Sequence, residues 1–230
     1  MAELDAPPRR TPLHAAHVAA GAKLVPFAGW EMPLQYEGII AEHLAVRERA
    51  GMFDVSHMGQ LRVVGASDIA ALQSRLSNDL ARIPDVGQAQ YSMLLDEHAG
   101  IIDDLIAYRI AGDELLLVVN AANRSVDASA LADVAEDVSD GWAMLALQGP
   151  VALDVLAELT GVDVRGEAPF RFVGAPIGDA ACIVATTGYT GERGCEILLP
   201  ADGARDVWDL LLADPRVAAC GLGCRDTLRL

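Results

Sequence analysis

Hydrophobic and polar positions between residues 59 and 212 repeat one order of predicted elements twice. Short apolar or alternating runs, typical of strands, enclose stretches with helical spacing. In the first half we predict a strand at 59–65, a helix at 67–76, a strand at 89–96, a two-strand hairpin at 100–120 and a helix at 123–135. In the second half we predict a strand at 142–149, a helix at 150–159, a strand at 170–178, two strands within 181–200 and a helix at 202–212.

This order predicts an α+β fold of two similar β-α-β-β-β-α units, with mixed or antiparallel sheets and flanking helices. Gly65 precedes the first helix, and Gly149 precedes the corresponding helix of the second half. The matched order of elements favours duplication over a chance similarity between two α+β halves. We expect an N-terminal segment at 1–57, the first unit at 58–139 and the second at 140–230.

Two helices are predicted in the N-terminal segment. Thr11 should cap the first helix, with Pro12 at its first position and Gly21 at its end. Prolines in "LVPFAGWEMPLQY" should interrupt any regular element in that stretch. The second helix, within 37–51, should bury an apolar face made of Ile39, Ile40, Leu44 and Val46.

Charge narrows the function classes. The 230 residues carry 17 basic and 33 acidic side chains, a formal charge of −16. Such a balance argues against a nucleic-acid-binding protein, which needs basic surface. The apolar runs are too short to span a bilayer, and the N-terminus lacks a secretory signal. Acidic residues near the start speak against a transit peptide, so we expect a cytoplasmic protein with no membrane partner.

Cysteines and histidines give no metal motif. Cys220 and Cys224 have no second closely spaced pair, and the five histidines are scattered. Reduced structural thiols are therefore expected at all four cysteines, and no metal. Phosphate-binding glycine motifs are also absent from the sequence, so no nucleotide is expected.

Two adjacent carboxylates interrupt the apolar run "GIIDDLIAY". Successive strand residues point to opposite faces, so Asp103 and Asp104 should have different surroundings. Either both carboxylates are solvent-exposed beside a turn, or one of them points into a cleft and marks a functional site. The residues alone leave both alternatives open.

The stretch "TTGYTGERGCEILL" is also unusual. Its glycines, Gly188, Gly191 and Gly194, permit close backbone approach or positive φ. Glu196 follows in a predicted strand. It is either a functional site residue or an ordinary charged residue on an edge strand. His57 in "FDVSHMG" could be a base, but a structural role is favoured.

Together these motifs resemble a known family. The stretches "RRTPLHAAHVAAGAKLVPFAGWEMPLQY", "FDVSHMG", "AGIIDDLIAY", "LALQGP", "GYTGERGCEI" and "GLGCRDTLRL" occur in the order found in the aminomethyltransferase of the glycine cleavage system, the T protein. The resemblance implies an interleaved two-lobe folate-binding region, with the segment 1–57 packing with the second lobe. The final helix reads as still in progress at Leu230, so the resemblance implies a longer parent with a further β-rich lobe.

The resemblance also implies a reaction. A one-carbon unit on the aminomethyl-lipoyl arm of the H protein passes to tetrahydrofolate, giving 5,10-methylenetetrahydrofolate, ammonia and the dihydrolipoyl carrier. Lipoylated H protein is thus the implied partner and tetrahydrofolate the implied co-substrate. The activity of a chain without the further lobe is left open.

Individual site residues follow from the same resemblance. Asp104 matches the family's catalytic carboxylate, and Asn120 is hypothesised to support it. The residues that match folate contacts are Glu196, Arg225, Tyr91, Tyr189 and Met58.

Two alternatives are weighed against this function. One is a folate-binding demethylase-type domain of the sarcosine and dimethylglycine class, which shares the architecture. The other is a folate-binding module without turnover. Retention of Asp104, Glu196 and Arg225 favours the transferase.

Overall fold

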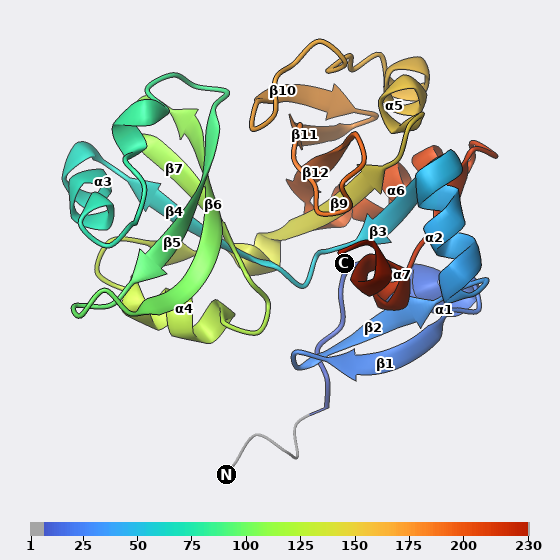
Figure 1. Cartoon of the computed structure of the whole chain (residues 1–230), viewed down its shortest axis with the longest axis horizontal. Helices are drawn as coiled ribbons and strands as arrows, with labels where there is room; N and C mark the ends of the chain where they lie inside the picture. The colour runs from blue at the N-terminus through green and yellow to red at the C-terminus, as the bar shows by residue number, and fades with distance from the viewer. Residues whose placement is uncertain (1–6, 230) are drawn as a thin grey trace.

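The computed structural model describes residues 7–229, and Figure 1 shows the arrangement of their helices and strands. The α-helices are α1 (His14–Ala19), α2 (Ile39–Glu48), α3 (Ala66–Gln73), α4 (Arg124–Ala130), α5 (Ala152–Thr160), α6 (Ala204–Leu212) and α7 (Leu222–Leu228). The strands are β1 (Lys23–Phe27), β2 (Trp30–Gln35), β3 (Ala50–Asp54), β4 (Gly59–Val64), β5 (Ala89–Leu95), β6 (Ile101–Ala111), β7 (Glu114–Val119), β8 (Glu136–Asp137), β9 (Trp142–Gln148), β10 (Phe172–Ile177), β11 (Ala180–Ala185), β12 (Gly194–Pro200) and β13 (Val217–Ala219). Short 3₁₀ turns lie at Leu80–Arg82, Ser139–Gly141 and Ala201–Gly203.

The predicted α+β fold and its repeated order are confirmed. The first unit runs β4-α3-β5-β6-β7-α4, and the second runs β9-α5-β10-β11-β12-α6. The two sheets have the orders β5-β6-β7-β4-β8 and β10-β11-β12-β9-β3-β13. All pairings are antiparallel except the parallel pairing of β13 with β3.

Strand β3 carries the N-terminal segment into the second unit's sheet. It pairs with β9 on one side and with β13 on the other. The division of the chain at 57/58 and 139/140 stays a prediction.

Three apolar layers hold the sheets and helices together. One lies between the five-stranded sheet and helices α3 and α4, and includes Leu72 and Leu105. A second lies between the six-stranded sheet and helices α1, α5 and α6, and includes Leu156 and Trp208. The third lies between the two sheets, where Tyr108 of β6 packs in the same cluster as residues of β9 and β12. Alternate residues of β6 therefore face either the helices or the opposite sheet.

The prolines of the N-terminal segment do not prevent regular structure, contrary to the prediction. Strands β1 and β2 form a two-stranded antiparallel hairpin that contains Pro26 and Pro33. In a two-stranded sheet every strand is an edge, so a proline without an N–H group is tolerated where that side faces away from the partner.

Thr11 does not cap α1. Its hydroxyl donates instead to the buried carboxylate of Asp54, at 2.6 Å, and the helix begins at His14 without a side-chain cap. Gly21 follows the helix with φ of +71°, as predicted for a glycine at a helix end.

The predicted buried face of α2 is confirmed only in part. Val46 is buried and Ile39 is partly buried, as predicted, but Ile40 is 78% exposed and Leu44 is 47% exposed, and Glu42 is buried. The Glu42 carboxylate accepts hydrogen bonds from the backbone N–H groups of Tyr36, Gly38 and Gly221. Because these N–H groups need an acceptor, the helix turns its acidic residue inward.

Helix α7 occupies the predicted C-terminal helix, and the predicted continuation at Leu230 lies outside the described residues. It packs against α2 and β2 (Figure 1). Within residues 7–229, every helix is too short or too polar to traverse a bilayer.

Candidate functional site

The paired carboxylates lie where β6 meets the end of β7. Leu105 is opposite Val119, the last residue of β7, so Asp104 and Asn120 form the next facing pair. The Asn120 side-chain amide donates to Oδ1 of both Asp103 and Asp104, at 3.0 Å each. This amide joins the two carboxylates although they point to opposite faces.

The two carboxylates have different surroundings, as strand alternation predicts. Asp103 is 5% exposed and lies on the helix-covered face with Leu105. Asp104 is exposed and shares the other face with Ile106, which packs against the layer between the sheets. The alternative that both carboxylates are wet is wrong, because Asp103 is buried.

Tyr91 lies beside Asp104 on the neighbouring strand. It pairs with Ile106 in the β5–β6 ladder, which puts it on the face of Asp104 in the diagonal position. Partial burial and the charge of Asp104 raise the pKa of Tyr91, and Tyr189 contributes to the same shift. Tyr91 therefore lies within electrostatic reach of both Asp104 and Tyr189.

Tyr189 connects the first unit to the C-terminal helix. Its ring lies 5.3 Å from the guanidinium carbon of Arg225 and 5.9 Å from that of Arg229. These distances are within the range of cation–π attraction. Tyr189 is 52% exposed, so part of its side chain is accessible from solvent.

Glu196 lies in a small hollow in the second unit, together with Tyr189 and Arg225. It pairs with Ala146 of β9, which pairs in turn with Phe53 of β3, so three strands form the floor. Burial raises the pKa of Glu196 against the opposing hydrogen bond from Thr187 and the charge of Arg225. Burial also lowers the pKa of Arg225, although the negative charge of Glu196 opposes this shift.

Glycines let the loop before β12 approach the end of β9, as predicted. A Cβ atom on Gly188 would lie 2.1 Å from the Gln148 side-chain oxygen, and one on Gly194 would lie 2.3 Å from the Leu147 carbonyl oxygen. Gly191 has φ of +76°. Larger residues would push this loop, and Tyr189 with it, away from the hollow.

Met58 and His57 lie at the start of the first unit. Met58 is partly buried and packs against the layer between the sheets. His57 is buried against Phe27, with ring centroids 5.6 Å apart. Burial, followed by the charge of Arg225, lowers the pKa of His57 to about 4, so its ring is neutral near pH 7.

Three supporting residues were missed in the sequence. Thr187 donates to the Glu196 carboxylate, and the Gln148 amide donates to the backbone oxygens of Thr187 and Cys195. Asn123 donates to Asp103 at 2.8 Å. Thr187 and Gln148 lie in motifs quoted above and Asn123 begins a predicted helix, yet only the folded chain shows which carboxylate each one supports.

Cys220 and Cys224 gain a third neighbour in the structure. Their sulfur atoms and a carboxylate oxygen of Glu42 lie within 4.8 Å of one another, all three residues being buried. The Glu42 carboxylate already accepts hydrogen bonds from three backbone N–H groups. Its position in this cluster is therefore better explained by satisfying the backbone at helix ends than by binding a cation. All four cysteines are free and buried, as predicted.

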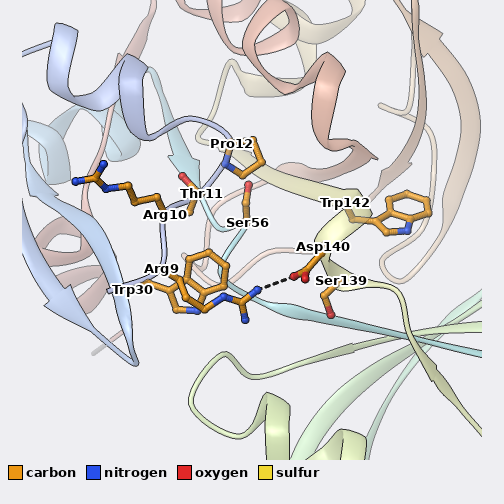
Figure 2. A pocket seen from close by; sticks show the side chains of 9 residues that line it. All are labelled: Arg9, Arg10, Thr11, Pro12, Trp30, Ser56, Ser139, Asp140 and Trp142. Atoms are coloured by element: carbon orange, nitrogen blue, oxygen red, sulfur yellow. Dashed lines mark hydrogen bonds and ion pairs between the residues drawn. The ribbon is translucent and has the colours of Figure 1, made fainter. Parts of the chain in front are cut away.

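A separate pocket of about 300 Å³ lies between the N-terminal segment and the start of β9. Figure 2 shows Arg9 alongside the Trp30 ring and pointing to Asp140, with which it forms a 2.6 Å ion pair. Its lining contains none of the site residues predicted from the sequence. Three of the predicted residues, Tyr189, Glu196 and Arg225, line the small hollow in the second unit instead.

Comparison with known proteins identifies the family. Residues 13–230 match the family model described as the GCVT N-terminal domain. The chain belongs to this family.

Curated relatives carry one functional name. The chain is 45% identical over 229 residues to an aminomethyltransferase of Deinococcus deserti, covering 96% of this chain and 64% of that protein. It is 46% identical over 231 residues to an aminomethyltransferase of Geobacillus thermodenitrificans, covering 96% of this chain and 63% of the relative. The chain thus spans less than two thirds of these relatives' length.

Solved structures share the fold. The crystal structure of glycine cleavage system aminomethyltransferase T from Bartonella henselae superimposes with a TM-score of 0.87 at 39% identity, over 96% of this chain and 62% of that one. A chain of heterotetrameric sarcosine oxidase from Corynebacterium sp. U-96 has a TM-score of 0.59 at 18% identity, over 96% of this chain and 97% of that one. The second similarity shows the fold alone.

Proposed function

We propose that this chain is the folate-binding part of a tetrahydrofolate-dependent aminomethyltransferase of glycine cleavage. The observation that carries the proposal is that Tyr189, Glu196 and Arg225 line one hollow, and that the charge of Tyr189 reaches Tyr91, which lies beside Asp104. The relatives' shared name supplies the reaction class.

The proposed donor is the aminomethyl group on the lipoyl sulfur of the H protein. Its carbon exchanges bonds to sulfur and nitrogen for bonds to N5 and N10 of tetrahydrofolate. The two hydrogens released from N5 and N10 end on the lipoyl sulfur and on ammonia. The products are 5,10-methylenetetrahydrofolate, ammonia and the dihydrolipoyl carrier.

Asp104 is proposed as the catalytic carboxylate. It is exposed on the face that leads to the layer between the sheets, and Asn120 orients one of its oxygens. A fixed carboxylate beside the folate nitrogens stabilises positive charge as the C–S bond breaks, and it can relay a proton. Holding donor and acceptor together supplies much of the remaining rate enhancement.

Glu196 is proposed to read the pterin ring. A carboxylate accepts two parallel hydrogen bonds from the amino and ring N–H groups of a 2-aminopyrimidinone edge. Arg225 lies in the same hollow, Tyr189 offers an aromatic face, and Met58 an apolar wall. A pterin between these groups would shield the Glu196 charge from water.

The first test is calorimetric titration of this chain with tetrahydrofolate. We expect saturable binding that weakens in Glu196→Gln and is unchanged in Glu97→Gln, whose side chain is 86% exposed. Absence of saturable binding, or equal binding by Glu196→Gln, contradicts the proposal.

The second test concerns the donor. Aminomethylated H protein should yield methylenetetrahydrofolate, whereas sarcosine or dimethylglycine should not. Turnover with sarcosine in place of the carrier would favour the demethylase alternative, and binding without any turnover by the longer parent protein that the resemblance implies would favour the non-catalytic module. A cytoplasmic location, expected from the acidic N-terminus, belongs to the same proposal.

The resemblance to the T protein leads to a third test, which compares this chain with a longer relative. It implies a further folate-contacting arginine from a third lobe. We therefore expect weaker folate binding by this chain than by the aminomethyltransferase of Geobacillus thermodenitrificans, measured under identical conditions. Equal affinity would contradict the contribution of that lobe.

A further inference from the structure

Two buried carboxyl groups meet behind Asp104. Asp103 on β6 is 5% exposed, and Asp127 on α4 is fully buried where the helix covers that strand. Their side chains lie within hydrogen-bonding reach of each other. Two ionised carboxylates in such contact, away from water, would repel each other strongly.

Hydrogen-bond donors are distributed unequally between the two carboxyl groups. Oδ1 of Asp103 accepts from the side-chain amides of Asn120 and Asn123, at 3.0 and 2.8 Å, and Oδ2 accepts from the Asn120 backbone N–H at 3.1 Å. Neither carboxyl oxygen of Asp127 has a donor among residues 7–229. The donors therefore stabilise negative charge on Asp103 and leave Asp127 unsatisfied as an anion.

The charges around Asp127 also disfavour its ionised form. Asp103 faces it from β6, and the charge of Asp104 acts on it from the other face of the same strand, so both nearby groups on β6 are acidic. On its own helix, the Arg124 guanidinium turns away to Asp137 and Asp140. Within the described chain no cation neutralises Asp127, so a proton is what allows this carboxyl group to be buried.

We propose that Asp127 is a neutral carboxylic acid that donates a hydrogen bond to Asp103, and that this pair positions Asn120 and thereby the Asp104 carboxylate. Asn120 is the link, because its amide contacts both Asp103 and Asp104. Asp127 is a positioning residue, since it touches Asp104 only through this chain of contacts. Its relevance to catalysis rests on the proposed function, whereas its protonation does not.

Electrostatics agree with this assignment. Burial and then the neighbouring Asp103 raise the pKa of Asp127 to about 8. Burial alone would also raise the pKa of Asp103, but the hydrogen bonds from Asn123 and Asn120 leave it lower than usual. The two groups share one proton and titrate as a pair.

The decisive measurement is a pH titration of the folded 230-residue chain with carbon-13-labelled aspartate, followed by NMR and infrared spectroscopy. We expect one protonated aspartate that titrates with an apparent pKa of about 8. This signal should be absent from Asp127→Asn and retained in Asp202→Asn, which changes an exposed aspartate. A wild-type chain without a protonated aspartate near neutral pH overturns the proposal, and it does so without any variant.

The positioning role is read from the Asn120 side-chain amide. In Asp127→Asn the new amide donates to Asp103 as the acid does, so exchange of the Asn120 amide hydrogens should stay close to wild type. In Asp127→Ala, Asp103 loses the proposed hydrogen bond from Asp127 and no longer holds Asn120 in one position. We therefore expect exchange of the Asn120 amide hydrogens to accelerate about tenfold or more. Equal exchange in wild type and Asp127→Ala overturns the positioning role. Because turnover is not among these readouts, failure of the proposed function is distinguishable from failure of this inference.

Discussion

In the first unit the strands lie in the order β5-β6-β7-β4, and in the second they lie in the equivalent order β10-β11-β12-β9. Both units also place a glycine with positive φ before their first helix, at Gly65 and Gly149. The carboxylates of the candidate site do not follow this equivalence. Asp104 lies near the start of β6, the third strand of its unit, whereas Glu196 lies on β12, the fourth strand of its own.

This difference separates scaffold from chemistry. The repeated order brings two sheets face to face around a shared apolar layer. Side chains at the border of that layer come from positions that the repeat does not relate. The first unit contributes an exposed carboxylate and the second a partly buried one. A duplicated scaffold can therefore acquire an asymmetric site through a few local differences.

Two buried acids, Asp54 in the six-stranded sheet and Asp127 on helix α4, should respond to pH with opposite signs, and this comparison carries the largest expected effect. Asp54 of β3 accepts hydrogen bonds from Thr11, His17 and the Ser56 backbone. Burial would raise its pKa, but these partners, His17 first, leave the pKa lowered. Asp54→Asn should destabilise the fold by about 3 to 5 kcal/mol near neutral pH, because one of the two oxygens that accept from Thr11, His17 and the Ser56 backbone becomes an NH2 group and the charge is lost.

The sign of the pH dependence sharpens the comparison. Asp54 contributes stability that is present above about pH 4 and is lost on acidification, so the penalty of Asp54→Asn should shrink at low pH. Asp127 has a pKa raised to about 8, so its native state retains a proton that the unfolded chain releases. Stability from Asp127 should thus fall as pH rises from about 4 toward 8, and Asp127→Asn should abolish that fall. Chemical denaturation across this pH range checks both, and matching signs for the two variants would break the comparison.

The two equivalent glycines should differ next. Gly65 has φ of +101° with open space around it, so Gly65→Ala should cost about 1 to 2 kcal/mol from backbone strain alone. Gly149 has φ of +135°, and a Cβ there would lie 2.4 Å from the Arg49 carbonyl oxygen. Gly149→Ala should cost about 2 to 4 kcal/mol because the clash adds to the strain. Equal losses in urea denaturation would show that the second unit relaxes around this position.

The two site carboxylates should divide binding from turnover. Glu196→Gln should weaken tetrahydrofolate binding on the order of 10- to 100-fold, since one acceptor of a charged pair becomes a donor. Asp104→Asn should leave binding within a few-fold and remove most turnover, because the role proposed for its charge is to act on the reacting nitrogens. Calorimetry and product formation measure the two effects separately. Wild-type turnover by Asp104→Asn would show that its catalytic assignment is wrong.

Sequence patterns predicted the element order well because apolar periodicity and glycine positions are local signals. Alternation within "GIIDDLIAY" also predicted that Asp103 and Asp104 face different surroundings. The roles of Asp104, Glu196 and Arg225 came from family resemblance, and the structure adds their spatial relation to Tyr91 and Tyr189.

Features that depend on distant partners could not be read in advance. The apolar residues Ile40 and Leu44 looked like a core face, but the backbone N–H groups that Glu42 serves turn α2 the other way. Thr11 looked like a helix cap until Asp54, 43 residues later, supplied a buried acceptor. The predicted helix at 123–135 gave no indication of a role for Asp127, because nothing local shows that α4 places this residue against Asp103.

Partly exposed arginines that join the two helices of each unit should give the smallest effects. In the first unit Arg75, just after α3, pairs with Asp133 beyond α4, and it also donates to the Ala130 carbonyl oxygen. In the second unit Arg216, beyond α6, pairs with Glu158 on α5. Solvent and salt screen such pairs, so Arg75→Ala and Arg216→Ala should each destabilise less than Gly65→Ala, and less still at high ionic strength. Arg75→Ala should be the more costly of the two, since its carbonyl contact is not screened as an ion pair is. A larger, salt-independent loss in Arg216→Ala would reverse this order and show that the second unit depends more on its helix–helix contact than the first.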